Sequence, residues 1–214
     1  MDSDLISFAL TAFATLLVTV GPHDSAAVYA SLTSGVHKPH RENLAWRSVS
    51  IAGILLLAFA LGGNQMLEVL NISMPAFRFA GGVLLFLGAV SLVFEKRDGM
   101  SSITAAEKQE ALGPKDIAIF PLAFPLIAGP GSLTAVVLLT GRANFEPVRM
   151  AIVIAALILC LLLTYVALRG AERLAQILGV TGADVVGRVS GIILAALAAQ
   201  FVFDGVREGH LFAA

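Results

Sequence analysis

The sequence has few of the residues on which redox, metal and nucleic-acid chemistry depend. Its only cysteine, Cys160, lies in an apolar stretch, so a disulfide framework, a CxxC pair and a cysteine metal cluster are excluded. Charged residues make up 14% of the chain, against about 25% in a typical soluble domain. The formal net charge of -1 also provides no basic face for a nucleic-acid backbone. We therefore expect neither a cofactor nor a metal ion, and no nucleic-acid partner.

Hydrophobic residues are abundant instead, at 57% of the chain. A helix of about 20 apolar residues crosses the roughly 30 Å hydrocarbon layer of a membrane. Six runs of about this length cover almost the whole chain, namely residues 5–34, 44–62, 74–94, 117–139, 148–168 and 185–206. We predict an all-α membrane protein with six transmembrane helices in a single domain, 1–214, whose main partner is the lipid bilayer.

Basic residues are distributed unequally between the two sides of these runs. The loops after the first, third and fifth runs hold Lys38, Arg41, Lys96, Arg97, Lys108, Lys115, Arg169 and Arg173, and the opposite side holds Arg142 and Arg207. Lys and Arg are retained on the cytoplasmic side of membrane proteins. The polar segment 95–116 is therefore predicted to be cytoplasmic and both termini to be outside. The start of the chain lacks a positively charged region and a cleavage site, which predicts that the first helix is retained.

The two halves of the chain resemble each other. Residues 78–89 align with residues 188–199, and both segments begin with arginine and share a glycine, leucines and a final alanine. A Gly-Pro pair precedes each segment, with Pro22 standing 56 residues before the first arginine and Pro130 standing 58 residues before the second. This predicts a duplicated three-helix unit, with repeat one at about 5–94 and repeat two at about 117–206. Chance similarity between apolar segments is the alternative.

An odd number of helices per unit makes the second copy enter the membrane from the opposite face, which gives an inverted 3+3 repeat. The Gly-Pro pairs fall inside the first and fourth runs, at Gly21-Pro22 and Gly129-Pro130. Proline lacks the N–H that continues a helix but suits the first position of a new one, so both helices are predicted to be broken there. Exposed backbone at membrane depth needs protein or water as partner, and paired breaks point to a substrate site. The alternative is a kink that serves packing alone.

The two breaks carry different chemistry. At the second, Gly129, Pro130 and Gly131 leave the backbone amides of a helix N-terminus accessible, and Ser132 and Thr134 add hydroxyl groups. A helix N-terminus attracts anions, so this set suits a carboxylate.

At the first break, Gly21, Pro22 and Ser25 surround Asp24, which offers an acceptor for an ammonium group or a proton. His23 is a candidate proton relay, because imidazole titrates near physiological pH. One site of each sign predicts a zwitterionic substrate of amino-acid size. The alternatives are a helix-capping role for Asp24 and a packed histidine at His23.

Several motifs resemble one known family. The segment 121–134 with its Pro-Leu-Ile-Ala-Gly-Pro-Gly core, and Gly21-Pro22 followed eleven residues later by Leu32-Thr33, are similar to the MarC/SnatA family of six-helix inner-membrane proteins. The closing pattern 191–200 with Asp204-Gly205 fits as well. The resemblance covers nearly the whole chain and implies a multi-pass protein of a prokaryotic inner membrane that exports or takes up small solutes such as neutral amino acids.

The chain departs from the family within the expected pocket. Where the family usually has Asn-Pro-Ile-Gly, this chain has Gly21-Pro22-His23-Asp24. We expect a secondary transporter that works by alternating access and is coupled to protons through Asp24. A non-transporting membrane subunit or assembly factor is the alternative, and an enzyme is not expected because the sequence has no HExxH motif and no second cysteine. The sequence leaves a homo-oligomer open.

Overall fold

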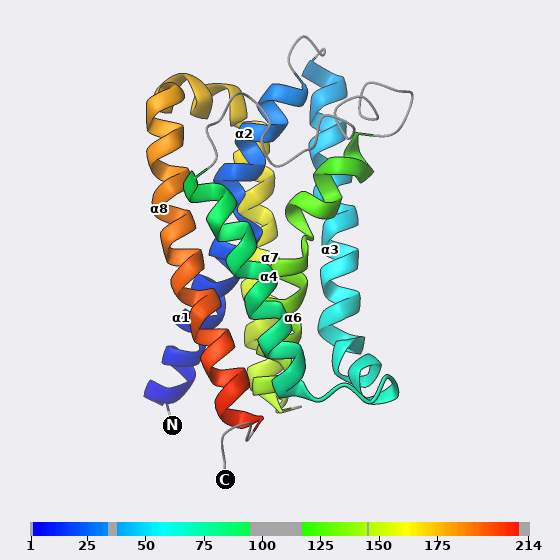
Figure 1. The fold of residues 1–214 in the computed structure, drawn as a ribbon. Helices are drawn as coiled ribbons and strands as arrows, with labels where there is room; N and C mark the ends of the chain where they lie inside the picture. The colour runs from blue at the N-terminus through cyan, green and yellow to red at the C-terminus, as the bar shows by residue number, and fades with distance from the viewer. Residues whose placement is uncertain (1, 34–37, 95–116, 145, 210–214) are drawn as a thin grey trace.

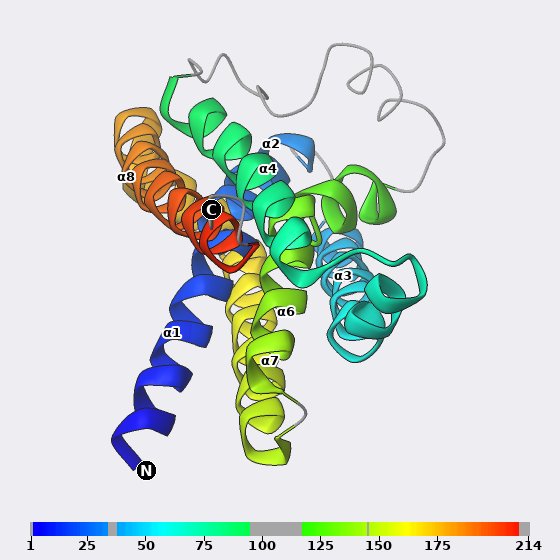
Figure 2. The same cartoon turned by 60° about the horizontal axis from the view of Figure 1, so that its bottom comes forward.

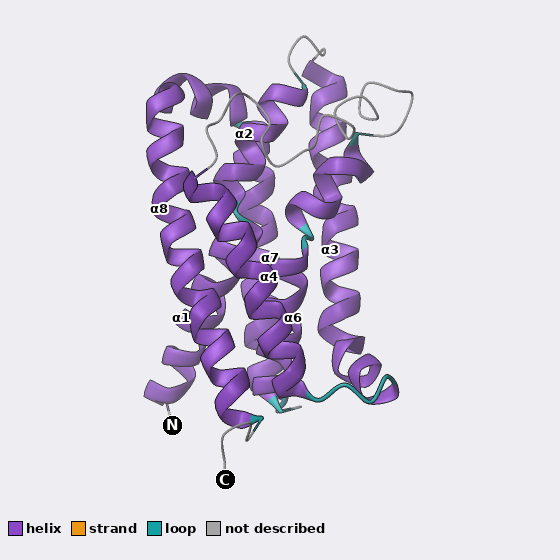
Figure 3. Ribbon diagram, in the orientation of Figure 1, coloured by secondary structure: helices purple, strands orange, loops and turns teal. Residues whose placement is uncertain are grey.

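Every secondary-structure element that the structure describes is a helix (Figure 3). The computed structural model describes residues 2–33, 38–94, 117–144 and 146–209. The elements are α1 (Asp2–Val20), α2 (Pro22–Leu32), α3 (Lys38–Val69), α4 (Met74–Phe94), η1 (Ala118–Ile127), α6 (Pro130–Ala143), α7 (Pro147–Arg169) and α8 (Ala171–Glu208). These ranges contain no strand, which confirms the predicted all-α class. The predicted cytoplasmic loop 95–116 lies outside the described residues.

The helices differ in length from the predicted apolar runs. The second run, 44–62, is extended at both ends in α3, and the sixth, 185–206, is the later part of α8. Only Gly170 separates α7 from α8. The prediction of a loop between the fifth and sixth runs is therefore wrong, because this stretch is the first part of α8. That stretch contains Ala, Leu, Glu and Arg, which are strong helix formers even where the sequence is too polar to cross a membrane.

Three helical stretches are long and apolar enough to cross a membrane: Asp4–Ala30, Pro39–Val69 and Pro147–Arg169. A fourth is added if the bent pair η1 and α6 counts as one span. Within the described residues, α4 is a shorter apolar helix over Met74–Val90. The fold is thus that of a helical membrane protein with three to four candidate spans by length and composition, where the sequence predicted six.

The helices run alternately up and down one bundle, as Figure 1 shows. α1, α4 and α7 run in one direction, and α3, α6 and α8 run back. α1 begins and α8 ends at the same end of the bundle, which we call the terminal end.

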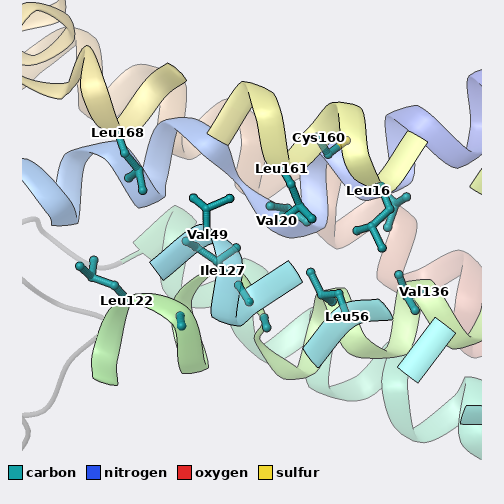
Figure 4. Packing of buried hydrophobic residues seen from close by; sticks show 14 of the residues in the cluster. Leu16, Val20, Val49, Leu56, Leu122, Ile127, Val136, Cys160, Leu161 and Leu168 are labelled. Carbon is teal, nitrogen blue, oxygen red and sulfur yellow. The ribbon is translucent and has the colours of Figure 1, made fainter. Parts of the chain in front are cut away.

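The core lies between helices that are distant in the sequence. α3 packs against η1 and α6, while α7 packs against α1 and α2. One large cluster of buried apolar residues joins these elements, and Figure 4 shows Val20, Val49, Ile127 and Leu161 gathered within it. The last residue of α1, Val20, and the last residue of η1, Ile127, therefore belong to the same core.

α4 and α8 form the closest helix pair and lie side by side (Figure 2). A Cβ atom added at Gly205 would lie 2.8 Å from the backbone nitrogen of Phe79, and one added at Gly82 would lie 2.9 Å from the carbonyl oxygen of Ala198. Glycine lets helix backbones meet directly in membrane proteins. The α4–α8 pair is therefore held by contacts that no larger side chain would permit.

Candidate functional site

The first helix break lies at Gly21, between α1 and α2. Gly21 adopts φ 57° and ψ 64°, a left-handed conformation that glycine reaches without steric cost. Pro22 occupies the first turn of α2, where the N–H that it lacks would have no helical partner. The N–H of Gly21 donates to the carbonyl of Leu17 at 3.1 Å, and the N–H of Ser25 donates to the carbonyl of Gly21 at 2.9 Å. The helix is interrupted at Gly21 as predicted, although Asp4–Ala30 remains one candidate span.

The second break is longer and sharper. η1 is an irregular, wide helix in which Phe120 and Phe124 have extended backbone angles. Each precedes a proline, and the proline ring pushes the residue before it out of the helical region. α6 begins at Pro130, and its axis is bent by 53° from that of η1. This break is also confirmed, and the cluster of prolines in the sequence is its cause.

A buried serine closes each break in the same way. The hydroxyl of Ser132 donates to the carbonyl of Ile127 at 2.9 Å and to that of Gly129 at 3.0 Å. The hydroxyl of Ser25 donates to the carbonyl of Val20 at 3.4 Å. In both cases the serine donates to the carbonyl five residues before it, which belongs to the last residue of the preceding helix, Val20 or Ile127. In this conformation the two hydroxyl hydrogens serve the backbone and are not directed to a ligand.

Asp24 and His23 meet at the opening turn of α2. A Cβ atom added at Gly21 would lie 3.4 Å from Oδ2 of Asp24, so the carboxylate folds back over the break. The Nε2 atom of His23 lies 3.1 Å from the same oxygen, and the two side chains are 27% and 17% exposed. A carboxylate at a helix N-terminus is stabilised by the backbone amides. This geometry suits both the capping role and the proton-relay role of the pair.

Close packing surrounds the glycines and the threonine of the second break. A Cβ atom at Gly129 would lie 2.3 Å from the carbonyl oxygen of Pro125, so the turn admits no side chain there. A Cβ atom at Gly131 would lie 2.5 Å from Cδ2 of Leu85 on α4. Thr134 is 4% exposed and faces α4, where its Cγ2 atom would lie 2.0 Å from a Cβ atom at Gly81. The sequence suggested that Thr134 binds a ligand, and the structure places its side chain between two helices.

Ion pairs at the ends of the helices are a feature that the sequence analysis did not predict. Asp4–Arg149, Arg78–Glu208, Arg142–Asp204 and Glu42–Arg169 each join two different helices. The partners are far apart in the chain, so only the four-residue spacing of Gln200, Asp204 and Glu208 could have signalled a shared polar face on α8. In the described part of the chain, no group of three or more His, Cys, Asp or Glu residues is placed to hold a metal ion.

The sequence is similar to a widespread group of membrane proteins. It is 34% identical over 206 residues to a UPF0056 membrane protein of Methanocaldococcus jannaschii, which covers 96% of this chain and 99% of the relative. It is 35% identical over 200 residues to a UPF0056 membrane protein of Aquifex aeolicus, covering 92% and 91% of the two chains. It is 28% identical over 198 residues to the UPF0056 inner membrane protein YhgN of Escherichia coli, covering 92% and 95%.

No solved structure matches the chain significantly. The sequence profile described as "MarC family integral membrane protein" matches residues 6–210, which include both helix breaks and all but the first residues of α1. With the broken helices and the relatives in three organisms, this match places the chain in the MarC family of integral membrane proteins.

Proposed function

We propose that this protein is a secondary transporter that moves a small zwitterion, such as a neutral amino acid, across a prokaryotic inner membrane by alternating access. The observation that carries the proposal is the pair of helix breaks, each with proline at the first helical position and a serine on the carbonyl five residues back. The helix ends that precede the breaks, Val20 and Ile127, lie in one core. Discontinuous helices in corresponding positions are typical of transporter binding sites.

Reciprocal packing supports the inverted 3+3 repeat with six spans. If α1 to α4 correspond to η1, α6, α7 and α8, the contacts of α3 with η1 and α6 match those of α7 with α1 and α2. The contact of α4 with α6 likewise matches that of α8 with α2. The corresponding helices run in opposite directions in Figure 1, as an inverted repeat requires. On this arrangement α4 and α8 are the third spans of the two repeats.

The two breaks supply groups that bind opposite charges. The carboxylate of Asp24 is the proposed acceptor for the ammonium group or for a coupling proton. His23, whose Nε2 atom lies 3.1 Å from Oδ2 of Asp24, is the proposed proton relay. The backbone amides at the N-terminus of α6, next to Gly131, are the proposed partners of the carboxylate. We propose transport by binding and conformational change, and we do not propose an enzymatic activity.

The test is solute counterflow in liposomes that contain the purified protein. A panel of labelled neutral amino acids is offered to the wild type and to Asp24→Asn, which keeps the size of the side chain and removes its charge. We expect uptake by the wild type and a reduction of at least about tenfold in the variant, because the ammonium or proton partner is lost. Asp4→Asn is the matched control, since Asp4 lies at the start of α1, is 73% exposed and should leave the flux unchanged.

Two results of the counterflow experiment would contradict parts of this proposal. Unchanged counterflow in Asp24→Asn would remove Asp24 from the mechanism. The absence of flux for the whole panel would overturn the transport proposal for neutral amino acids and favour a non-transporting subunit.

A further inference from the structure

A polar stripe on α8 ties three helices together at the terminal end. Gln200, Asp204 and Glu208 are four residues apart and therefore share one face of the helix. Asp204 pairs with Arg142 at 2.8 Å and also accepts a hydrogen bond from Nε2 of Gln200 at 2.8 Å. Glu208 pairs with Arg78, whose side chain is only 6% exposed. The stripe thus holds α6 through Arg142 and α4 through Arg78.

The two ion pairs join helices that differ in how closely they pack. Arg78–Glu208 reinforces α4 and α8, which already meet backbone to backbone at their glycines. Arg142, in contrast, stands in the last turn of α6, a half-helix that joins η1 through a 53° bend. Its side chain is 38% exposed and that of Asp204 is 22% exposed, so this pair is partly exposed. A partly exposed pair of this kind is weak enough to open and re-form.

Next to the Arg142–Asp204 pair, one apolar cluster joins α6 to both α4 and α8. Leu138, one turn before Arg142, is 1% exposed and belongs to this cluster with Leu85 and Ala89 of α4 and Leu194, Ala198 and Phe201 of α8. This apolar contact must separate if the end of α6 moves away from the α4–α8 pair.

We propose that the Arg142–Asp204 pair is a latch that holds the terminal end of the bundle closed, and that this end opens when α6 swings about its break at Gly129. The α4–α8 pair, fixed by Gly82, Gly205 and the Arg78–Glu208 contact, is the stationary side. The inference rests on the proposed function, because a transporter with alternating access needs a contact on each face that breaks once per cycle.

The test is the labelling rate of a buried cysteine. In a Cys160→Ala background, Leu138→Cys is exposed to a membrane-impermeant thiol reagent in membrane fragments that are open on both sides. We expect Asp204→Asn to raise the labelling rate by roughly fivefold, the shift in open population that follows the loss of one partly exposed ion pair. Arg142→Gln breaks the same pair from α6 and should have the same effect. The exchanged pair Arg142→Asp with Asp204→Arg should restore slow labelling.

Asp4→Asn is the control, because it breaks an ion pair at the same end that does not involve α8. Unchanged labelling in both Asp204→Asn and Arg142→Gln would overturn the latch, as would an equal increase in Asp4→Asn, which would indicate general loosening. The labelling needs no solute. Its failure would therefore remove the latch and leave the transport proposal intact, whereas absent counterflow would remove transport without altering the labelling result.

Discussion

At the scale of single residues, the second break depends on glycines that leave no space for a side chain. A Cβ atom added at Gly129 would lie 2.3 Å from the carbonyl oxygen of Pro125. This oxygen belongs to the backbone, which cannot move aside as a flexible side chain can. Gly88 on α4 has no atom within 4 Å of its Cβ position. The two glycines therefore have opposite requirements, although each lies in an apolar run.

We expect Gly129→Ala to lower the free energy of unfolding by about 1–3 kcal/mol, the usual cost of overpacking a filled site. Gly88→Ala should leave stability unchanged or raise it, because alanine favours the helix. Thermal unfolding of the purified variants in detergent measures both. Equal melting temperatures for the two variants would contradict the tight turn at Gly129.

The serines at the breaks give a second prediction for single residues. Ser132→Ala removes the side-chain donor from the carbonyl of Ile127, and an unsatisfied buried polar group costs about 1–3 kcal/mol. The carbonyl of Gly129 keeps the N–H of Leu133 as its donor, at 3.0 Å. Ser25→Ala removes one longer bond, at 3.4 Å, and should cost less. Thermal unfolding again provides the measurement. A larger loss in Ser25→Ala than in Ser132→Ala would show that the hydroxyl bonds are not what stabilises these turns.

At the scale of elements, the glycines between α4 and α8 decide how closely the two helices approach. A side chain at Gly205 would meet the backbone nitrogen of Phe79 and the carbonyl oxygen of Pro75, at 2.8 and 2.9 Å. The helices would have to separate to admit it.

We expect Gly205→Leu to destabilise the protein by more than about 3 kcal/mol, because backbone atoms of α4 block the new side chain. Gly62→Leu is the matched control, since no atom lies within 4 Å of its Cβ position on α3. The yield of monodisperse protein after extraction and its melting temperature report the difference. Similar values for the two variants would mean that the α4–α8 contact contributes little to the fold.

At the scale of the whole molecule, the order of helix directions fixes where the ends of the chain lie. α1 begins and α8 ends at the same end of the bundle, which agrees with the proposed six crossings (Figure 1). The segments after the first, third and fifth apolar runs, at the opposite end, carry the excess of Lys and Arg. This predicts that the terminal end faces outward.

Epitope tags fused to the two ends test this arrangement. We expect antibody to reach both tags in intact spheroplasts, without permeabilisation. Tags on opposite faces would exclude six crossings, whereas two tags that are reached only after permeabilisation would reverse the orientation and keep the even number.

The sequence by itself determined the helical class, the family and the positions of both breaks. These depend on local chemistry, because apolar runs form helices in a membrane, and proline suits the first turn of a helix but interrupts the backbone hydrogen bonds of its interior. The extended backbone of Phe120 and Phe124 follows from the prolines after them for the same reason.

Only the tertiary structure decided which side chains meet. Thr134 faces Gly81, and Arg142 reaches Asp204 across 62 residues, because packing of distant helices brings them together. The sequence proposed Ser132 and Thr134 as groups for a ligand, but it could not show that Ser132 donates to a backbone carbonyl or that Thr134 lies against a neighbouring helix. Periodicity describes the face of one helix, whereas the partner of that face depends on the arrangement of the whole bundle.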